Sequence, residues 1–128
     1  MIETQEAFDN LEEIASTHGL DGLYIGTADL TIGLNQGKLR PGFDRTEPEM
    51  IKAKKKILEI AHRNGKVACL HCGTPEYAAQ AADWGFDLVT ITNDVRLLSG
   101  AASAHVNKFK ELTNQKTDTS SETDTSSY

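Results

Sequence analysis

The chain has 128 residues, the length of a single domain, with a modest hydrophobic fraction of 38% and a formal net charge of −6. Its dense basic run, residues 52–56, fits the solvated face of a helix and is too short to neutralise a stripe of phosphates, so we exclude nucleic acid as a partner. The first residues lack the features of a signal peptide, and no apolar run approaches the ~20 residues that cross a bilayer. We therefore expect a cytoplasmic protein without a membrane-spanning segment.

The N-terminal segment predicts the stump of a strand, then a helix and a second strand. The stump ends at Glu3, and residues 4–18 place apolar side chains at the spacing of one buried helix face. The second strand, residues 22–26, breaks at a glycine and delivers Asp29 at its carboxyl end. Glu3 and Asp29 are thus two carboxylates separated by 26 positions, or one βα unit.

The middle of the chain predicts a long loop, a helix and a third strand. Residues 31–45 contain several Gly and Pro and read as a loop; at about fifteen residues it has the length of functional or mobile loops. Thr46 and Glu49 have the spacing of a capping box, which predicts that the next helix begins there. The strand over residues 67–72 follows that helix and carries His71 near its carboxyl end.

The last part of the chain predicts a helix, a strand, a final helix and a polar tail. The alanine-rich helix spans residues 77–84, and the strand with alternating apolar residues spans residues 87–92. Apolar residues recur along one face of the final helix, which begins at Asp94. Residues 113–128 repeat Thr, Asp and Ser almost without apolar groups, and we expect a disordered tail.

Strands and helices that alternate with short turns are typical of a parallel α/β fold. Residues 1–112 amount to four βα units, the first with a truncated strand. A complete (β/α)8 TIM barrel takes about 250 residues. The sequence therefore predicts half of such a barrel. Half a barrel leaves sheet edges and the inner face of its strands open, so we expect something else to cover them.

Glu3 and Asp29 are the candidate metal ligands. Two carboxylates at the ends of neighbouring barrel strands can hold a divalent ion such as Mg²⁺ or Mn²⁺ at the catalytic face. Each residue also has a plainer interpretation. Glu3 can be an acidic residue beside a helix N-terminus, and Asp29 can be a turn or capping residue.

His71 is the candidate acid–base residue, because such groups lie at the carboxyl ends of barrel strands. The alternative is a hydrogen-bonded histidine that lines the pocket without chemical work. Since strand residues alternate, Cys69 shares the face of His71 and Cys72 points the other way. This alternation argues against a zinc site and against a disulfide within the strand.

Several segments resemble the C-terminal half of the HpcH/HpaI aldolase family: the Glu3-Thr4 pair, Gly-Thr-Ala-Asp-Leu at residues 26–30, and residues 65–68 and 93–98. The resemblance extends over about residues 1–112. It implies a metal-dependent aldolase in which Glu3 and Asp29 bind Mg²⁺, Mn²⁺ or a similar ion. That ion would hold the carboxylate and keto oxygens of pyruvate and stabilise its enolate. The backbone N–H groups of Ala28 and Asp29 would help to hold the pyruvate carboxylate.

The resemblance assigns no catalytic residue to this chain, because the family's histidine base and its substrate-polarising arginine belong to the first half of the barrel. Thr27 stands where the family usually has proline, a minor change at a turn. We expect a fragment of a carbon–carbon lyase that cleaves a 4-hydroxy-2-oxo acid into pyruvate and an aldehyde, with its base and its substrate anchor supplied from elsewhere or lost. The resemblance also implies an oligomer built through the last helix, either a homo-oligomer or a complex with a full-length relative.

Two alternatives remain open. In the first, the chain is a non-catalytic half-barrel that acts by associating with a full-length relative. In the second, it is a citrate lyase-type acyl-CoA lyase subunit, which shares the barrel and the paired carboxylates. The Gly-Thr-Ala-Asp-Leu sequence at residues 26–30 favours the aldolase.

Overall fold

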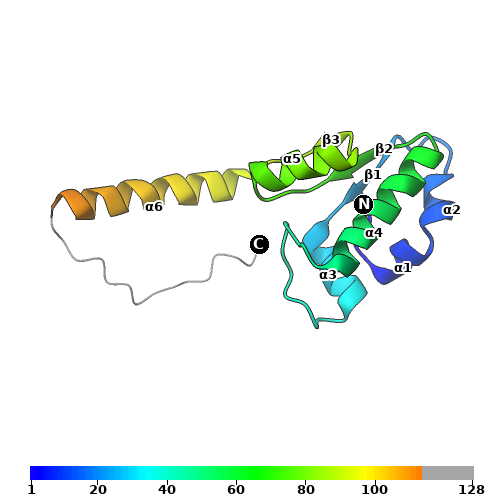
Figure 1. Cartoon of the computed structure of the whole chain (residues 1–128), viewed down its shortest axis with the longest axis horizontal. Helices are drawn as coiled ribbons and strands as arrows, with labels where there is room; N and C mark the ends of the chain where they lie inside the picture. Colours follow the sequence, from blue (N-terminus) through cyan, green and yellow to red (C-terminus); the bar gives the residue numbers. More distant parts are fainter. Residues whose placement is uncertain (114–128) are drawn as a thin grey trace.

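The computed structural model describes residues 1–113, and its centre is a three-stranded parallel sheet (Figure 1). The strands β1 (Gly22–Ile25), β2 (Val67–Leu70) and β3 (Leu88–Val89) lie in the order β1-β2-β3. Ile2 forms an isolated parallel bridge with Ile25, so the predicted strand stump occupies the place beside β1. The parallel sheet and its intervening helices confirm the predicted α/β fold.

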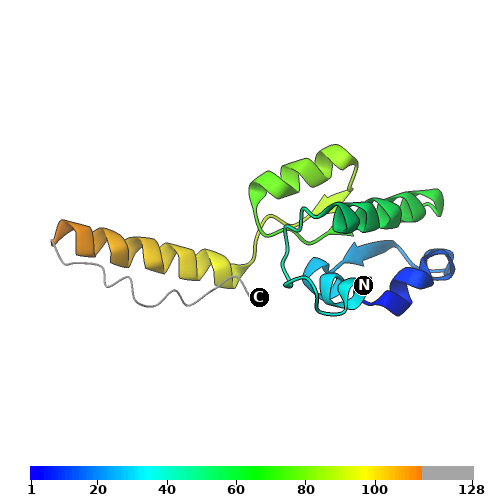
Figure 2. The same ribbon diagram turned by 60° about the horizontal axis from the view of Figure 1, so that its bottom comes forward.

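Six helices accompany the strands within residues 1–113: α1 (Gln5–Asp9), α2 (Leu11–Ala15), α3 (Thr27–Asn35), α4 (Pro48–Arg63), α5 (Pro75–Trp84) and α6 (Asp94–Leu112). Helix α4 packs on β1 and β2, and α5 packs on β3 (Figure 2). Leu23, Ile25 and Leu70 are at most 3% exposed and share one hydrophobic core with Ile57 of α4. The helix-facing side of the sheet therefore supplies the core of the molecule.

The opposite face of the sheet is open in the described chain. Alternation places Tyr24, Cys69 and His71 there, and all three side chains are only partly buried. Leu88 pairs with Cys69 and is 52% exposed. This agrees with the expectation that a half-barrel leaves the inner face of its strands uncovered.

The helix expected over residues 4–18 is wrong as a single element. It is divided at Asn10 into α1 and α2. The Asn10 side-chain amide donates to the Glu6 carbonyl at 2.9 Å and so competes with the helical backbone for an acceptor. Leu11 and Ala15 still turn toward the core, so the apolar pattern identified the buried face correctly.

Two further boundaries differ from the prediction. The loop expected over residues 31–45 is wrong at its start, because α3 continues to Asn35. The capping box at the start of α4 is also wrong: Glu47 is the N-cap residue and has no side-chain capping bond, since its carboxylate pairs with Arg45. The helix begins at Pro48 without a side-chain capping bond, because the proline ring pre-sets the backbone torsion of a first helical turn.

Strand β3 is shorter than the predicted residues 87–92. Side chains take part in the hydrogen bonding at both of its ends. The Asp87 carboxylate accepts from Ala68 N at 2.8 Å, and the Thr90 hydroxyl accepts from Cys72 N at 2.9 Å. These side-chain bonds extend the attachment to β2 beyond the two paired residues of β3.

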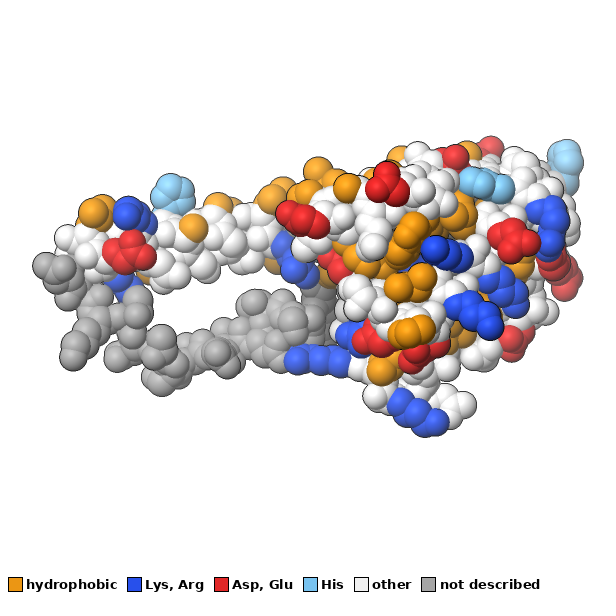
Figure 3. All heavy atoms as spheres, viewed as in Figure 1, with side chains coloured by type: hydrophobic (Ala, Val, Ile, Leu, Met, Phe, Trp, Pro, Cys, Tyr) orange, Lys and Arg blue, Asp and Glu red, His pale blue; other side chains and the backbone are white. Residues whose placement is uncertain are grey.

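Helix α6 projects from the body of the molecule in both ribbon views (Figures 1 and 2). No residue of this helix is buried within the described chain, so its apolar face stays uncovered there. Figure 3 shows hydrophobic side chains along the projecting helix, and Val95 and Leu98 are 70% and 74% exposed. No helix within residues 1–113 is long and apolar enough to cross a membrane. The predicted disordered tail lies, apart from Thr113, outside the described residues.

Candidate functional site

Close backbone contacts position the Glu3 side chain. The strand stump is held by the bond from Ile2 N to the Tyr24 carbonyl at 2.8 Å. A Cβ atom added to Gly26 would lie 2.2 Å from Glu3 Oε1, so the carboxylate occupies the space that a larger residue would fill. Gly33 of α3 makes a similar approach to the Glu3 carbonyl oxygen, at 2.9 Å from its would-be Cβ. Glu3 therefore lies directly over the β1–α3 turn.

Asp29 lies in the first turn of α3, not in a loop. The N–H groups of Ala28 and Asp29 are among those that a first helical turn leaves without intrahelical acceptors. The start of the helix is fixed by Thr27, a fully buried residue whose hydroxyl donates to the His71 carbonyl at 3.4 Å. Thr31 adds a buried bond from its hydroxyl to the Thr27 carbonyl at 2.7 Å.

The chemistry of the two carboxylates is that of ligands for a divalent ion. Within residues 1–113, neither the Glu3 nor the Asp29 carboxylate takes part in a hydrogen bond or an ion pair, so no cation among these residues is paired with them. Their oxygens are the hard donors that Mg²⁺ prefers, and this ion is usually held by one or two carboxylates while keeping several waters. The described residues contain no cluster of three or more His, Cys, Asp and Glu side chains suited to a metal. Waters and substrate oxygens would therefore complete the coordination.

His71 lies one strand away, on the level of Gly26. The register pairs Ile25 with Leu70, and His71 N donates to the Ile25 carbonyl at 3.2 Å, which continues the pairing by one residue. Its Nδ1 forms a 2.7 Å hydrogen bond with the Tyr24 hydroxyl. This bond accords with the pocket-lining interpretation of His71, while its acid–base role stays a prediction.

Tyr24 is a site residue that sequence reasoning missed. Burial raises the pKa of its hydroxyl, with a smaller opposite effect from a hydrogen bond with Thr90. The phenol therefore keeps its proton at neutral pH, and its oxygen can also accept from a protonated His71 Nδ1. Its position two residues before Gly26, on the same face of β1, was the available signal.

Phe43, from the connection between α3 and α4, covers His71. The two ring centroids are 4.7 Å apart, and the guanidinium of Arg96 lies 5.7 Å from the Phe43 centroid. Nothing in the spacing of the sequence signalled this contact, because it joins a loop residue to a strand end through space.

The two cysteines face opposite sides of β2, as alternation predicted. Cys69 is partly buried and lies on the face of Tyr24 and His71, whereas Cys72 is fully buried on the helix side. Burial raises the pKa of the Cys72 thiol to about 11. A thiol with this pKa is protonated at neutral pH and is a weak metal ligand and nucleophile.

This arrangement can be compared with known proteins. A family profile described as HpcH/HpaI aldolase/citrate lyase matches residues 1–100. The chain belongs to this family. Two curated relatives are named aldolases. The hydroxypyruvate/pyruvate aldolase of Rhizorhabdus wittichii is 40% identical over 102 residues, and the 5-keto-4-deoxy-D-glucarate aldolase of Klebsiella pneumoniae subsp. pneumoniae is 30% identical over 110 residues.

The chain spans about two fifths of the length of these relatives. The two alignments cover 80% and 86% of this chain but 39% and 41% of the relatives. A crystal structure of an HpcH/HpaI aldolase/citrate lyase family protein from Burkholderia cenocepacia superimposes with a TM-score of 0.72 at 27% identity, covering 85% of this chain and 40% of that one. The family resemblance is thus confirmed, and the fold is that of a partial TIM barrel.

Proposed function

We propose that this chain carries the metal-binding part of an aldolase site. The reaction would be the reversible cleavage of a 4-hydroxy-2-oxo acid into pyruvate and an aldehyde. One observation carries the proposal: Glu3 lies over Gly26, Asp29 lies in the helical turn that follows, and neither carboxylate has a partner among the described residues. The names of the curated relatives support the reaction class.

Each group in this arrangement has a role in the proposal. Glu3 and Asp29 would hold Mg²⁺ or Mn²⁺, and the bound ion would supply Lewis-acid polarisation of the keto group. The N–H groups of Ala28 and Asp29, at the positive end of α3, would bind the pyruvate carboxylate. Cleavage breaks the C3–C4 bond: the C4 hydroxyl gives its proton to a base as the aldehyde C=O forms, and the bonding electrons stay on pyruvate as its enolate, which then takes up a proton at C3. To accept the hydroxyl proton at Nε2, His71 would carry its own proton on Nδ1 and donate it to the Tyr24 oxygen; a base from another chain is the alternative.

Association through α6 is the second part of the proposal. Its apolar residues Val106, Phe109 and Leu112 are 53%, 59% and 73% exposed and continue the stripe begun by Val95 and Leu98. A helix that exposes such a stripe is typical of an interface, so a second copy or a full-length relative would cover it. If association is the only property of the chain, it is the non-catalytic half-barrel of the alternative interpretation.

Manganese binding by calorimetry tests the site directly. We expect Glu3→Ala and Asp29→Ala each to abolish Mn²⁺ binding, because a hard ion held by two carboxylates loses half of its protein ligands. Glu6→Ala is the matched control, since it removes the same charge from the exposed first turn of α1. Unchanged affinity in Glu3→Ala or Asp29→Ala would remove that residue from the site.

Turnover assays distinguish the reaction classes. The chain alone, and the chain mixed with a full-length relative, would be supplied with 4-hydroxy-2-oxo acids and separately with acyl-CoA esters. Metal-dependent pyruvate release from the keto acids supports the aldolase. Turnover of acyl-CoA esters alone would favour the citrate lyase-type alternative, and binding to the relative without any turnover would favour the non-catalytic module.

A further inference from the structure

The connection between α3 and α4, residues 36–47, has two polar attachments, or fastenings, beside Phe43 to the rest of the described chain. One fastening uses the side chain of Asp44, and the other uses the backbone carbonyl of Arg45. Both points lie beside Phe43, the residue whose ring covers His71. The connection is therefore held in place immediately next to the candidate site.

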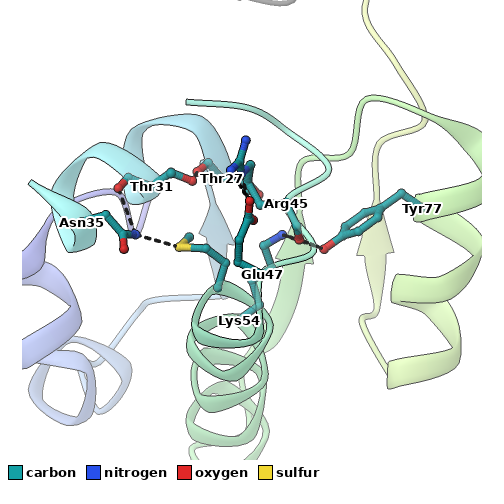
Figure 4. A network of polar contacts seen from close by, with 8 residues as sticks. Thr27, Thr31, Asn35, Arg45, Glu47, Lys54 and Tyr77 are labelled. Carbon is teal, nitrogen blue, oxygen red and sulfur yellow. Dashed lines mark hydrogen bonds and ion pairs between the residues drawn. The ribbon is translucent and has the colours of Figure 1, made fainter. Parts of the chain in front are cut away.

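Lys54 binds the Arg45 carbonyl and so provides one of the two fastenings. This lysine of α4 is fully buried, and its ammonium donates to the Arg45 carbonyl at 3.1 Å and to the Tyr77 hydroxyl at 2.7 Å. The Tyr77 hydroxyl donates to the same carbonyl at 2.6 Å (Figure 4). Burial lowers the pKa of Lys54 to about 8. A fully buried lysine is rare, and the ammonium of this one bonds to the Arg45 carbonyl and to the Tyr77 hydroxyl beside it.

The side chain of Asp44 provides the other fastening. Its carboxylate accepts from Gly73 N and from the Thr74 hydroxyl, each at 2.7 Å, and so ties the connection to the β2–α5 turn. A Cβ on Gly73 would lie 3.2 Å from Phe43 Cβ and 3.3 Å from an Asp44 oxygen. The β2–α5 turn therefore approaches the connection so closely at Gly73 that a side chain there would press against Phe43 and Asp44.

These fastenings determine where the Phe43 ring lies. The ring packs on His71, which lies on the level of Gly26 and therefore of the Glu3 carboxylate. The pyruvate-binding groups proposed above belong to the β1–α3 turn, whereas Phe43 lies over the end of the neighbouring strand. The part of a substrate that extends away from pyruvate toward β2 would meet an aromatic wall.

We propose that Lys54 and Asp44 are positioning residues that hold Phe43 over His71, and that Phe43 limits the size of the aldehyde part of the substrate. The second half of this statement rests on the proposed function, while the first half depends only on the fold. Hydrophobic walls of this kind discriminate by about 10- to 200-fold for each methylene group that does or does not fit.

Amide exchange at Gly73 tests the positioning role without metal or substrate. Its N–H is bonded to Asp44, so its exchange rate, followed by NMR, reports whether the connection is docked. We expect Asp44→Ala and Lys54→Met each to accelerate this exchange at least about tenfold, and to expose the Arg45–Thr46 bond to trypsin. Lys52→Met, the same change at an exposed position of α4, is the control and leaves both unaltered.

A second variant guards against a failure of Lys54→Met to fold. Tyr77→Phe keeps the ring and removes only the hydroxyl that shares the Arg45 carbonyl. We expect it to accelerate Gly73 exchange to a smaller degree. Exchange rates in Asp44→Ala, Lys54→Met and Tyr77→Phe that match the Lys52→Met control would overturn the positioning role.

The selectivity role is tested by aldehyde competition in the synthetic direction. The ratio of kcat/KM for butanal to that for acetaldehyde, with pyruvate as the other substrate, should rise at least about tenfold in Phe43→Ala. Lys54→Met should shift the ratio in the same direction although it does not contact the site, whereas the KM for pyruvate stays the same. An unchanged ratio would overturn the selectivity role. A wild-type chain inactive alone and with a full-length relative would overturn it together with the proposed function, while amide exchange still decides the positioning role.

Discussion

Helices α4 and α6 have similar sequence patterns and opposite environments. Both are long and amphipathic, yet α4 buries seven residues against the sheet and its neighbours, and α6 buries none. The pattern of apolar residues therefore identifies which face of a helix is apolar, but not whether the same chain or another one covers that face. For α4 the cover comes from the same chain, and for α6 we propose that it comes from another.

Matched leucine substitutions sharpen this difference most strongly. Leu58→Ala in α4 should destabilise the chain by about 2–5 kcal/mol, because it empties space in the core. Leu98→Ala in α6, at a residue that is 74% exposed, should change the free energy of unfolding of a dissociated chain by less than about 0.5 kcal/mol. Urea denaturation at low protein concentration measures both. Equal losses would show that α6 packs within its own chain.

The buried Lys54 should make the stability of the α4 region depend on pH. Its pKa is about 8 in the folded chain and ordinarily 10.5, so the unfolded chain binds more protons between these values and stability rises with pH. The gain has an upper limit of roughly 3 kcal/mol at about 1.4 kcal/mol per pKa unit. Lys54→Met should lack it.

The difference between wild type and Lys54→Met isolates this lysine. Cys72 acts in the opposite direction, since its raised pKa of about 11 makes the folded chain the stronger proton binder above pH 9. Asp44, Glu47 and Arg45 also interact electrostatically with this amine. Urea denaturation at pH 7.5, 8.5 and 9.5 measures the difference, and a constant difference would contradict the lowered pKa.

Glycine substitutions compare the crowded site with the free helix. Gly73→Ala should cost about 1–3 kcal/mol, because the new methyl group pushes against Phe43 and Asp44. Gly100→Ala in α6 meets no atom within 4 Å and should stabilise the helix by about 0.5–1 kcal/mol. Thermal melts of both variants measure the two signs, and a stabilising Gly73→Ala would contradict the close contact.

Helix caps provide the smallest test. Thr74 and Asn93 cap α5 and α6 through bonds to Tyr77 N and Arg96 N, and replacing either by alanine should cost about 1 kcal/mol. Thr74→Ala should cost more, since its hydroxyl also bonds to Asp44. Losses of equal size would show that the Asp44 bond adds nothing to stability.

Local patterns in the sequence account for the architecture and for much of the candidate site. The alternation of strands and helices, the core face of α4 and the opposed faces of Cys69 and Cys72 follow from backbone periodicity, which acts between near neighbours. The short segments around Glu3 and Asp29 were enough to suggest the family. The break at Asn10 was missed, because a side chain that competes for a backbone carbonyl does not alter the apolar spacing.

The remaining features arise from contacts between residues far apart in the chain. Tyr24 bonds to His71, Lys54 reaches Tyr77, and Asp44 reaches Gly73, over 47, 23 and 29 positions. No periodicity links such residues, because their proximity exists only after the sheet and helices have packed. A run of lysines in the sequence favoured a solvated face for Lys54, and only the packing of α4 against α5 and the connection supplied the acceptors that let its amine be buried.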